Sequence, residues 1–376
     1  MRALVTGGAG LIGSHLVDML VRAGHTVRSF DALEPLVHRD GAPSWLSPHA
    51  EFVHGDVRDA DAVARALDGI DVVFHLAAYG GFFPDLSKLC DVNVTGTAVL
   101  LETIRDRAQG VRKVVVASSQ VVYREGAVRC PVHGVQNPPS REVERLRAAR
   151  WSVPCPVCSL DTVSVPTPID APASGQTPYA VSKYAQERLA LVWGEQTGTP
   201  VVALRFPCTY GPRQSIFNPY TGIIAIFCTR LLNGLAPVLY EDGEQTRDLC
   251  YVEDVARATM LAADGRALDG RAVNVGSGRP VSVRRVAEIV AGVLDSPMHP
   301  EMHGDFRPGD LRALFTESDV RAPAGFMPRV ELRAGVARYV EWIRSRSDVR
   351  EYFAEAQERL RSSGLVHRSV ENVARA

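Results

Sequence analysis

The stretch TGGAGLIG at residues 6–13 lies between a short apolar run, Arg2–Thr6, and an amphipathic stretch, Ile12–Ala23. The apolar run predicts a strand and the stretch after it predicts a helix. Gly7 permits a tight turn, Gly10 lets the backbone approach a pyrophosphate, and Gly13 lets helix and strand pack closely. The N-terminus of the helix would offer its N–H groups to the phosphates. A glycine pattern alone can be an ordinary turn, but the strand–turn–helix context predicts a dinucleotide-binding unit.

Asp31 indicates which dinucleotide this unit prefers. It ends a second apolar run, Thr26–Phe30, about 20 residues after the glycines. A carboxylate at this position can accept hydrogen bonds from the ribose hydroxyls, and it would repel a 2′-phosphate. Ala32 and Leu33 supply no compensating cation, although Arg28 is near in sequence. We therefore expect NAD rather than NADP.

Further apolar runs continue the alternation of strands and helices. We expect strands at Glu51–His54, Val72–Leu76 and Lys113–Ala117, and helices at Ala60–Leu67 and Val92–Arg107. The strands are apolar throughout, as strands covered on both faces are. Strands separated by helices of this length predict an α/β fold with a Rossmann-type, doubly wound parallel sheet.

The chain is expected to form two lobes and two additions. Residues 1–207 would form the nucleotide-binding lobe, and residues 124–168, rich in Pro, Arg and Cys, would form an insertion in it. Residues 208–345 would mainly form a smaller substrate lobe, with some segments returning to the first lobe. Residues 346–376 would form a charged, helical C-terminal extension with a polar tail.

Composition excludes several classes of partner. The 376 residues include 42 Lys+Arg and 43 Asp+Glu, a net charge of -1, which argues against a nucleic-acid footprint or a polybasic membrane surface. The longest apolar runs are too short to span a bilayer, and no targeting segment is visible at the N-terminus. We therefore expect a cytoplasmic protein that binds neither nucleic acid nor membrane.

The stretch YAVSK at residues 179–183 is the second chemical motif. On a helix Tyr179 and Lys183 share one face, and a nearby ammonium would lower the pKa of the phenol, making it a usable general acid/base. Ser119 follows the strand at Lys113–Ala117 and could hydrogen-bond the same substrate oxygen. A Tyr and a Lys four residues apart are common by chance, but together with Ser119 and the glycine turn they predict a catalytic triad.

These motifs resemble the extended short-chain dehydrogenase/reductases, the NAD-dependent nucleotide-sugar epimerase/dehydratase family, from Arg2 to about Ile343. The run Gln214–Gly222, with Asn218-Pro219-Tyr220-Thr221-Gly222, resembles the dTDP-L-rhamnose 4-epimerase-like branch in particular. Further matches are His75-Leu76-Ala77-Ala78, Asn93, Tyr123, Arg205, Tyr210-Gly211-Pro212-Arg213, Arg247-Asp248, Val252-Glu253-Asp254-Val255, Asn274-Val275-Gly276-Ser277-Gly278 and Arg307-Pro308-Gly309-Asp310.

The resemblance implies roles for individual residues and a homodimeric assembly. Asn93 should buttress the active-site helix, and Arg247 and Arg307 should clamp a diphosphate, with ordinary surface ion pairs as the alternative for these arginines. The implied NAD contacts are Gly7, Gly10, Leu11, Ile12, Gly13, Asp31, Asp56, Val57, Leu76, Ala77, Ala78, Asn93, Ser118, Tyr179 and Lys183. The implied substrate contacts are Tyr79, Ser119, Gln120, Cys208, Asn218, Arg247, Arg307 and Asp310.

For Asp56, two interpretations remain open at this point. It follows a strand where a carboxylate could meet an adenine amino group, but it could equally be the N-cap of the next helix. Two residues also depart from the family pattern: Cys208 stands where many relatives have an Asn, and Arg124 replaces a Gly. Both departures lie near the expected sugar and diphosphate.

The residues after Ser119 discriminate among reactions. Related 4,6-dehydratases carry an Asp-Glu pair there and related decarboxylases a Glu, whereas this chain has Gln120 and Val121, which cannot act as acid or base. We therefore expect a C4 epimerase of a dTDP- or UDP-linked sugar that works through a transient 4-keto intermediate. The alternatives are a 4-ketoreductase or dehydrogenase and a catalytically silent dinucleotide-binding protein. If dehydration did occur, Glu125 and Asp85 would be the first candidates for its acid and base.

The insertion carries a separate pattern of possible metal ligands. Cys130 and His133 are separated by two residues, and Cys155 and Cys158 repeat this spacing, with a proline after the first ligand of each pair. Four such side chains suit a closed, tetrahedral Zn²⁺ site with a structural role. A disulfide between Cys155 and Cys158 and free cysteines in a loop are the alternatives.

Overall fold

The computed structural model describes residues 1–81, 85–218, 220, 222–320 and 324–370. In this part of the chain seven strands form one parallel sheet in the order β13-β9-β5-β4-β1-β2-β3. The order reverses between β1 and β4, which is the topological switch point where doubly wound folds bind their ligands. The strands are β1 (Arg2–Thr6), β2 (Thr26–Asp31), β3 (Glu51–His54), β4 (Val72–His75), β5 (Lys113–Ser119), β9 (Val201–Phe206) and β13 (Arg271–Asn274).

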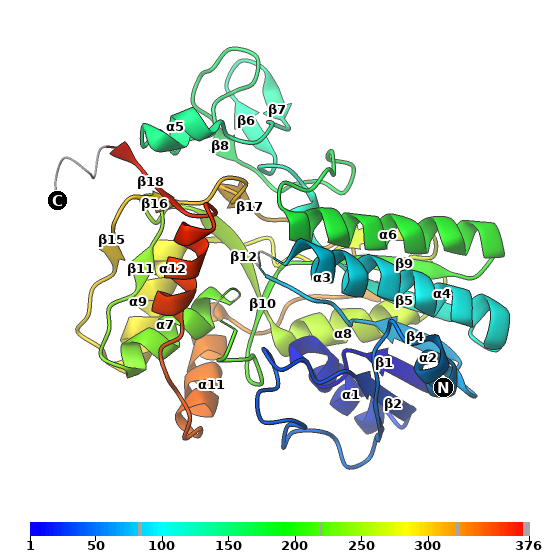
Figure 1. The fold of residues 1–376 in the computed structure, drawn as a ribbon. Coiled ribbons are helices and arrows are strands. Elements are labelled where there is room, and N and C mark those ends of the chain that lie inside the picture. The colour runs from blue at the N-terminus through cyan, green and yellow to red at the C-terminus, as the bar shows by residue number, and fades with distance from the viewer. Residues whose placement is uncertain (82–84, 219, 221, 321–323, 371–376) are drawn as a thin grey trace.

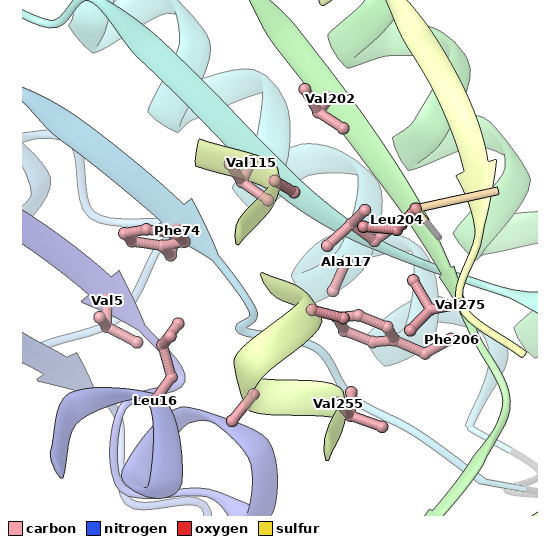
Figure 2. Packing of buried hydrophobic residues seen from close by; sticks show 14 of the residues in the cluster. Val5, Leu16, Phe74, Val115, Ala117, Val202, Leu204, Phe206, Val255 and Val275 are labelled. Carbon is pink, nitrogen blue, oxygen red and sulfur yellow. The ribbon is translucent and has the colours of Figure 1, made fainter. Parts of the chain in front are cut away.

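Helices cover both faces of this sheet, as the apolar strands predict (Figure 1). Alternate residues of β1 face opposite layers: Ala3 and Val5 belong to one buried cluster and Leu4 to another. Figure 2 shows the first cluster, in which Leu16 and Val255 from two helices pack against the strands. The helices of this face are α1 (Leu11–Arg22) and α8 (Val252–Ala263), and those of the other face are α2 (Ala60–Leu67), α4 (Gly96–Arg107) and α6 (Pro178–Thr197).

The helix expected at Val92–Arg107 is interrupted. A short helix, α3 (Leu86–Cys90), comes first, a π-helical turn follows at Asp91–Thr95, and α4 completes the run. Such turns are rare and frequently occur at functional sites. This one contains Asn93, whose side chain is fully buried.

The insertion forms a small sheet that projects from the main body (Figure 1). Its strands pair antiparallel in the order β7-β6-β8. Val143–Arg147 forms a short helix beside them, α5. The strands are β6 (Val128–Cys130), β7 (Gly134–Gln136) and β8 (Val163–Ser164).

The second lobe is built around β12 (Thr246–Tyr251), and α8 and β13 return from it to the first lobe. β12 pairs with two parallel neighbours and one antiparallel neighbour. The further elements are β10 (Cys208–Tyr210), α7 (Ile223–Leu232), β11 (Val238–Leu239), β14 (Pro280–Ser282), α9 (Val283–Leu294), β15 (Glu301–Met302), β16 (Asp305–Phe306), β17 (Ala313–Leu314) and α11 (Leu332–Arg344).

The C-terminal segment is only partly the helix that its charge pattern predicts. It forms a helix, α12, over Phe353–Ser362 and then a short strand, β18, at His367–Arg368. β18 pairs antiparallel with β16, and Gln357 Nε2 and Arg361 Nη2 donate to Asp305 at 3.0 and 2.6 Å. The buried Asp305 carboxylate therefore fixes the segment against the second lobe. The expected polar tail falls largely in 371–376, outside the described residues.

Candidate active site

The glycine turn is built so that no side chain fits inside it. Gly7 has φ +69°, and a Cβ there would lie 2.8 Å from the backbone nitrogen of Ala77. A Cβ on Gly13 would lie 2.0 Å from the carbonyl oxygen of Gly7, whereas one on Gly10 would meet nothing closer than 3.3 Å. Gly7 and Gly13 thus allow close backbone approach at the turn, and the space beside Gly10 is open.

A first cavity of about 320 Å³ opens at this turn, at the carboxyl ends of β1 and β4. Its walls are mostly apolar, and the N-terminus of α1 faces it. Of the residues predicted to contact NAD, it is lined by Gly7, Gly10, Leu11, Ile12, Gly13, Asp31, Asp56, Val57, Leu76, Ala77 and Ala78. The donor set fits a dinucleotide, since it offers backbone N–H groups for phosphates and a carboxylate for a ribose.

Asp31 lies in the wall of this cavity, where its carboxylate accepts backbone hydrogen bonds from Ala9 at 3.0 Å and Leu33 at 2.8 Å. The nearby Arg28 is turned away. Its guanidinium donates to Glu51 Oε2 at 2.8 Å and to the carbonyl of Ala66 at 2.8 Å. Arg28 is therefore engaged elsewhere and does not offer a cation to a 2′-phosphate.

The structure rules out one of the two interpretations of Asp56, the helix N-cap. Asp59, not Asp56, caps α2, because its carboxylate accepts from the backbone nitrogens of Asp61 and Ala62, both at 3.0 Å. Asp56 lines the first cavity and pairs with Arg58 at 2.6 Å. The hydrogen bond from Arg58 holds the pKa of Asp56 below its usual range. Asp56 is therefore an ionised acceptor at the cavity wall.

Asn93 buttresses the helix that carries the tyrosine, as the resemblance implies. Its amide accepts from the backbone nitrogen of Tyr79 at 2.7 Å and donates to Tyr79 O and to Ser182 Oγ, each at 2.9 Å. Ser182 in turn donates to the carbonyl of Tyr179 at 2.8 Å. Asn93 thus joins the cofactor wall to α6 without lining the cavity itself.

The helix α6 places Tyr179 and Lys183 in a buried setting. Thr177 caps it by accepting from the backbone nitrogen of Ala180 at 3.2 Å, and Pro178 occupies its first turn, where a missing N–H costs nothing. Burial lowers the pKa of Lys183 to about 7 and raises that of Tyr179 to about 12. The expected lowering of the tyrosine pKa is therefore not produced by Lys183, whose ammonium donates to Gln186 Oε1 instead.

A buried chain of polar side chains runs from Lys183 to the glycine turn. Gln186 Nε2 donates to Thr97 Oγ1 at 2.9 Å, and His75 bridges Thr97 Oγ1 at 2.9 Å and Thr6 Oγ1 at 2.8 Å. Burial lowers the pKa of His75 to about 3, so its ring is neutral. Sequence reasoning missed Gln186 and Thr97; the helical spacing from Lys183 to Gln186 was the available signal.

A second cavity, of about 300 Å³, adjoins the first at Gly80, which lines both. A Cβ built on Gly80 would lie 3.8 Å from the phenolic oxygen of Tyr179, so this oxygen stands where the two cavities meet. Of the predicted substrate contacts, the second cavity is lined by Gln120, Cys208, Arg247, Arg307 and Asp310, together with Tyr179. Four residues of α12 also line it, at helical spacing: Phe353, Ala356, Gln357 and Leu360.

Two arginines and one carboxylate form a cluster in this second cavity. Arg247 Nη2 and Arg307 Nη2 donate to opposite oxygens of Asp310, at 2.6 and 3.2 Å. The Arg307 guanidinium also lies 4.8 Å from the centre of the Tyr240 ring. Burial would raise the pKa of Asp310, but the arginines outweigh it and keep that pKa below the usual range. The cluster is largely buried at a cavity wall, which distinguishes it from an ordinary ion pair on the protein surface.

Gln120 and Cys208 lie side by side in the same wall. The Gln120 amide donates to Cys208 Sγ at 3.9 Å, and its Oε1 is buried without a partner among the described residues. The two side chains that depart from or discriminate within the resembled family, Cys208 and Gln120, therefore both line the second cavity.

Some predicted contacts lie elsewhere. Tyr79 and Asn218 line the first cavity, not the second, so the structure places them with the cofactor contacts. Ser118 donates its hydroxyl to Glu187 Oε2 at 2.6 Å and lines neither cavity. Ser119 accepts from the backbone nitrogen of Val121 at 3.4 Å, at the start of a short 3-10 turn, Gln120–Val122.

Residues 3–142 and 162–276 match the family described as "NAD dependent epimerase/dehydratase family". The chain belongs to this family. The interval between the two matched segments lies within the insertion. The family description names NAD as the cofactor but covers both epimerases and dehydratases. The residues of the second cavity must therefore indicate which of the two reactions occurs.

Individual members of the family are similar over most of the chain. A dTDP-L-rhamnose 4-epimerase of Burkholderia thailandensis is 34% identical, covering 92% of this chain and 96% of its own. The UDP-glucose 4-epimerase of Thermotoga maritima, solved with UDP-glucose, aligns with TM-score 0.73 and 28% identity over 92% of this chain and 99% of that one. The UDP-glucose 4-epimerase of Thermus thermophilus, solved with NAD, aligns with TM-score 0.72 and 30% identity over the same shares.

In the insertion, this member of the family brings four possible metal ligands together. The ligand atoms of Cys130, His133, Cys155 and Cys158 all lie within 4.8 Å of one another. The Cys130 and Cys158 sulfurs are 3.7 Å apart, and His133 Nδ1 lies 3.7 Å from the sulfurs of Cys130 and Cys155. The three cysteines and the histidine are thus gathered from two turns, and among the described residues no disulfide joins the cysteines.

Among the described residues, no helix is both long enough and apolar enough to cross a membrane.

Proposed function

We propose that this protein is an NAD-dependent epimerase that inverts C4 of a dTDP- or UDP-linked sugar. The observation that carries the proposal is the position of the Tyr179 phenol, at the junction of a cavity suited to a dinucleotide and a second cavity with an arginine cluster. A sugar bound in the second cavity could therefore place its hydroxyl against the Tyr179 phenol and its carbon next to the first cavity.

In such a reaction, each of the predicted site residues would have its own role. Tyr179 would take the proton from the C4 hydroxyl and return it after the sugar has turned. Ser119 would hold the sugar oxygen, and Lys183 would hold the nicotinamide ribose. NAD, which the residues of the first cavity would hold, would supply a reversible acceptor for the C4 hydride, and its positive charge would favour the phenolate form of Tyr179 against the effect of burial. Arg247 and Arg307 would hold the diphosphate, for which guanidinium groups are well suited.

Among its described lining residues, the second cavity offers no unengaged carboxylate for water elimination. Among the described residues that line it, Asp310 is the one carboxylate, and it is engaged by two arginines. The two other candidates for the acid and base of a dehydration, Glu125 and Asp85, are engaged elsewhere. Glu125 is buried against Arg141, and Asp85 accepts a hydrogen bond from Tyr79 at 3.4 Å and is not among the residues that line this cavity. These positions support epimerisation over dehydration.

The reaction can be tested with isotopes. A panel of dTDP-, UDP- and GDP-sugars is incubated with the protein, and products are resolved by NMR. For the accepted sugar we expect the C4 epimer, no 4-keto-6-deoxy product and no net consumption of nicotinamide. A deuterium placed on C4 should remain on the sugar through many turnovers, because hydride returns to the carbon it left. Washout of the label by added NADH would favour a ketoreductase, and a 4-keto-6-deoxy product would refute the argument from Gln120 and Val121.

We also propose that Cys130, His133, Cys155 and Cys158 bind a structural zinc ion. Bonds of about 2.3 Å from a tetrahedral zinc to two sulfurs place those sulfurs about 3.8 Å apart, close to the 3.7 Å between Cys130 and Cys158. The backbone nitrogens of Val132 and Val157 donate to the sulfurs of Cys130 and Cys155 at 3.4 and 3.5 Å, which would stabilise thiolates. All four positions would be filled by protein, so the metal would have no catalytic role.

The assembly is proposed to be a homodimer. Three apolar side chains on α6, Val181, Leu189 and Val192, are between 36 and 54% exposed. Their spacing places them along one side of the helix, and a second copy packed there would remove them from water. Light scattering should give twice the chain mass at micromolar concentration, and Val181→Asp should shift it toward the monomer. A monomer mass for the unaltered protein would refute this proposal.

A further inference from the structure

Arg141 is one of the side chains that join the insertion to the second lobe. Its guanidinium is 2% exposed, and all five of its N–H donors have acceptors. Nε donates to Glu125 at 3.0 Å, Nη1 to Glu241 at 2.9 Å and to Trp151 O at 3.1 Å, and Nη2 to Glu241 at 3.0 Å and to Asp310 O at 2.8 Å. One insertion residue therefore fixes four segments of the chain.

The segment from Asp310 to Arg312 is held at each of its residues by this network and its neighbours. Arg141 binds the carbonyl of Asp310, and Arg247 Nη1 binds the carbonyl of Leu311 at 2.7 Å. Glu125 Oε2 accepts from the backbone nitrogen of Arg312 at 2.8 Å. Asp310 is also the residue whose carboxylate sets the positions of two cavity arginines, so its backbone and side chain join the insertion to that cluster.

Glu241 shows that the contact with Arg141 is specific. Its backbone lies in the left-handed region, with φ +53°, and its carboxylate is buried. A non-glycine residue persists in that region only where its surroundings hold it there. Arg141 engages both of its oxygens, and Arg312 Nη1 adds a contact at 2.9 Å. A strained backbone and a buried charge are thus both maintained at the point where the insertion docks.

We propose that Arg141 is a positioning residue: it holds the Asp310 backbone, and through it the geometry of Arg247 and Arg307, so that the insertion sets the affinity for the substrate's nucleoside diphosphate. This inference rests on the function proposed above. It assigns the insertion a role in substrate binding, although Arg141 does not line either cavity.

The test compares binding of UDP and dTDP with retention of NAD. Arg141→Met should raise the Kd for the preferred nucleoside diphosphate by at least tenfold and raise KM similarly, with kcat within about threefold of wild type and the NAD content per chain unchanged. Arg141→Lys, which keeps the charge but loses the fork, should give a smaller increase. Arg147→Met is the matched control, since Arg147 is exposed and its one ion pair among the described residues is with Glu144, at 3.9 Å; its Kd values should equal those of wild type.

The binding measurements distinguish an error in the proposed substrate class from an error in the role of Arg141. If wild type binds neither UDP nor dTDP, the proposed substrate class is wrong and the inference fails with it. If wild type binds and Arg141→Met binds equally well while melting at a lower temperature, Arg141 is merely structural. A parallel loss of NAD would indicate general damage and would likewise overturn the inference. If Arg141→Met does not fold, Glu125→Gln replaces it, because this change weakens the same network at constant size. The Kd for UDP and dTDP and the NAD content are then compared with wild type in the same way.

Discussion

Replacing Tyr179 by phenylalanine is expected to lower turnover by at least ~10²-fold, the usual contribution of a positioned general acid/base. The variant loses only the phenolic oxygen at the junction of the two cavities. NAD content should be nearly unchanged, because the glycine turn and Asp31 remain. Steady-state turnover of the accepted sugar and NAD released on denaturation are the two measurements.

A matched control for this variant lies on the same helix. Tyr184→Phe removes the same oxygen one residue after Lys183, from a tyrosine that lines neither cavity. It should keep wild-type turnover. If Tyr179→Phe also stays within a few-fold of wild type, another group is the proton acceptor and the assignment is wrong.

Purified protein is expected to carry close to one zinc per chain, and Cys155→Ser to lose most of it. Loss of a structural metal belongs to the few changes that cost about 4 kcal/mol or more of folding free energy. Cys155 is buried in the insertion, away from the phenol, so the midpoint of thermal unfolding should fall far more than the chemical rate constant. Elemental analysis and thermal unfolding are the measurements.

Cys90→Ser serves as the comparison, because Cys90 is an exposed thiol far in sequence from the cluster. It should change neither zinc content nor the unfolding midpoint. A wild-type protein that is metal-free, fully active and as heat-stable as a zinc-loaded sample would show that the four side chains do not form a metal site.

The first lobe could be predicted in detail because its signals are local. The glycine turn, the apolar strands and the bounds of α2 all follow from residues within one element or its immediate flanks. Similarly, the ligand spacing in the insertion identified a cluster that the structure brings together. In each case neighbouring residues carry the information, and tertiary packing reinforces it.

The remaining features depend on partners distant in sequence. The charged pattern after Ser345 predicts one helix, but β18 forms because β16 and the Asp305 carboxylate offer it hydrogen bonds from 63 residues away. The resemblance assigned Tyr79 and Asn218 to the substrate, but the two cavities adjoin, and only coordinates show which cavity each residue lines. The pKa of Tyr179 was expected to fall, and burial, which spacing does not reveal, raises it.

The position of α12 has a consequence for how selectivity can evolve. Phe353, Ala356, Gln357 and Leu360 form one stripe of the second cavity, and none of them lines the first. Substitutions in this stripe can reshape the pocket for the sugar nucleotide while the phenol and the dinucleotide cradle stay as they are. In this chain, adaptation to a new substrate can therefore begin at α12, with the chemistry inherited unchanged.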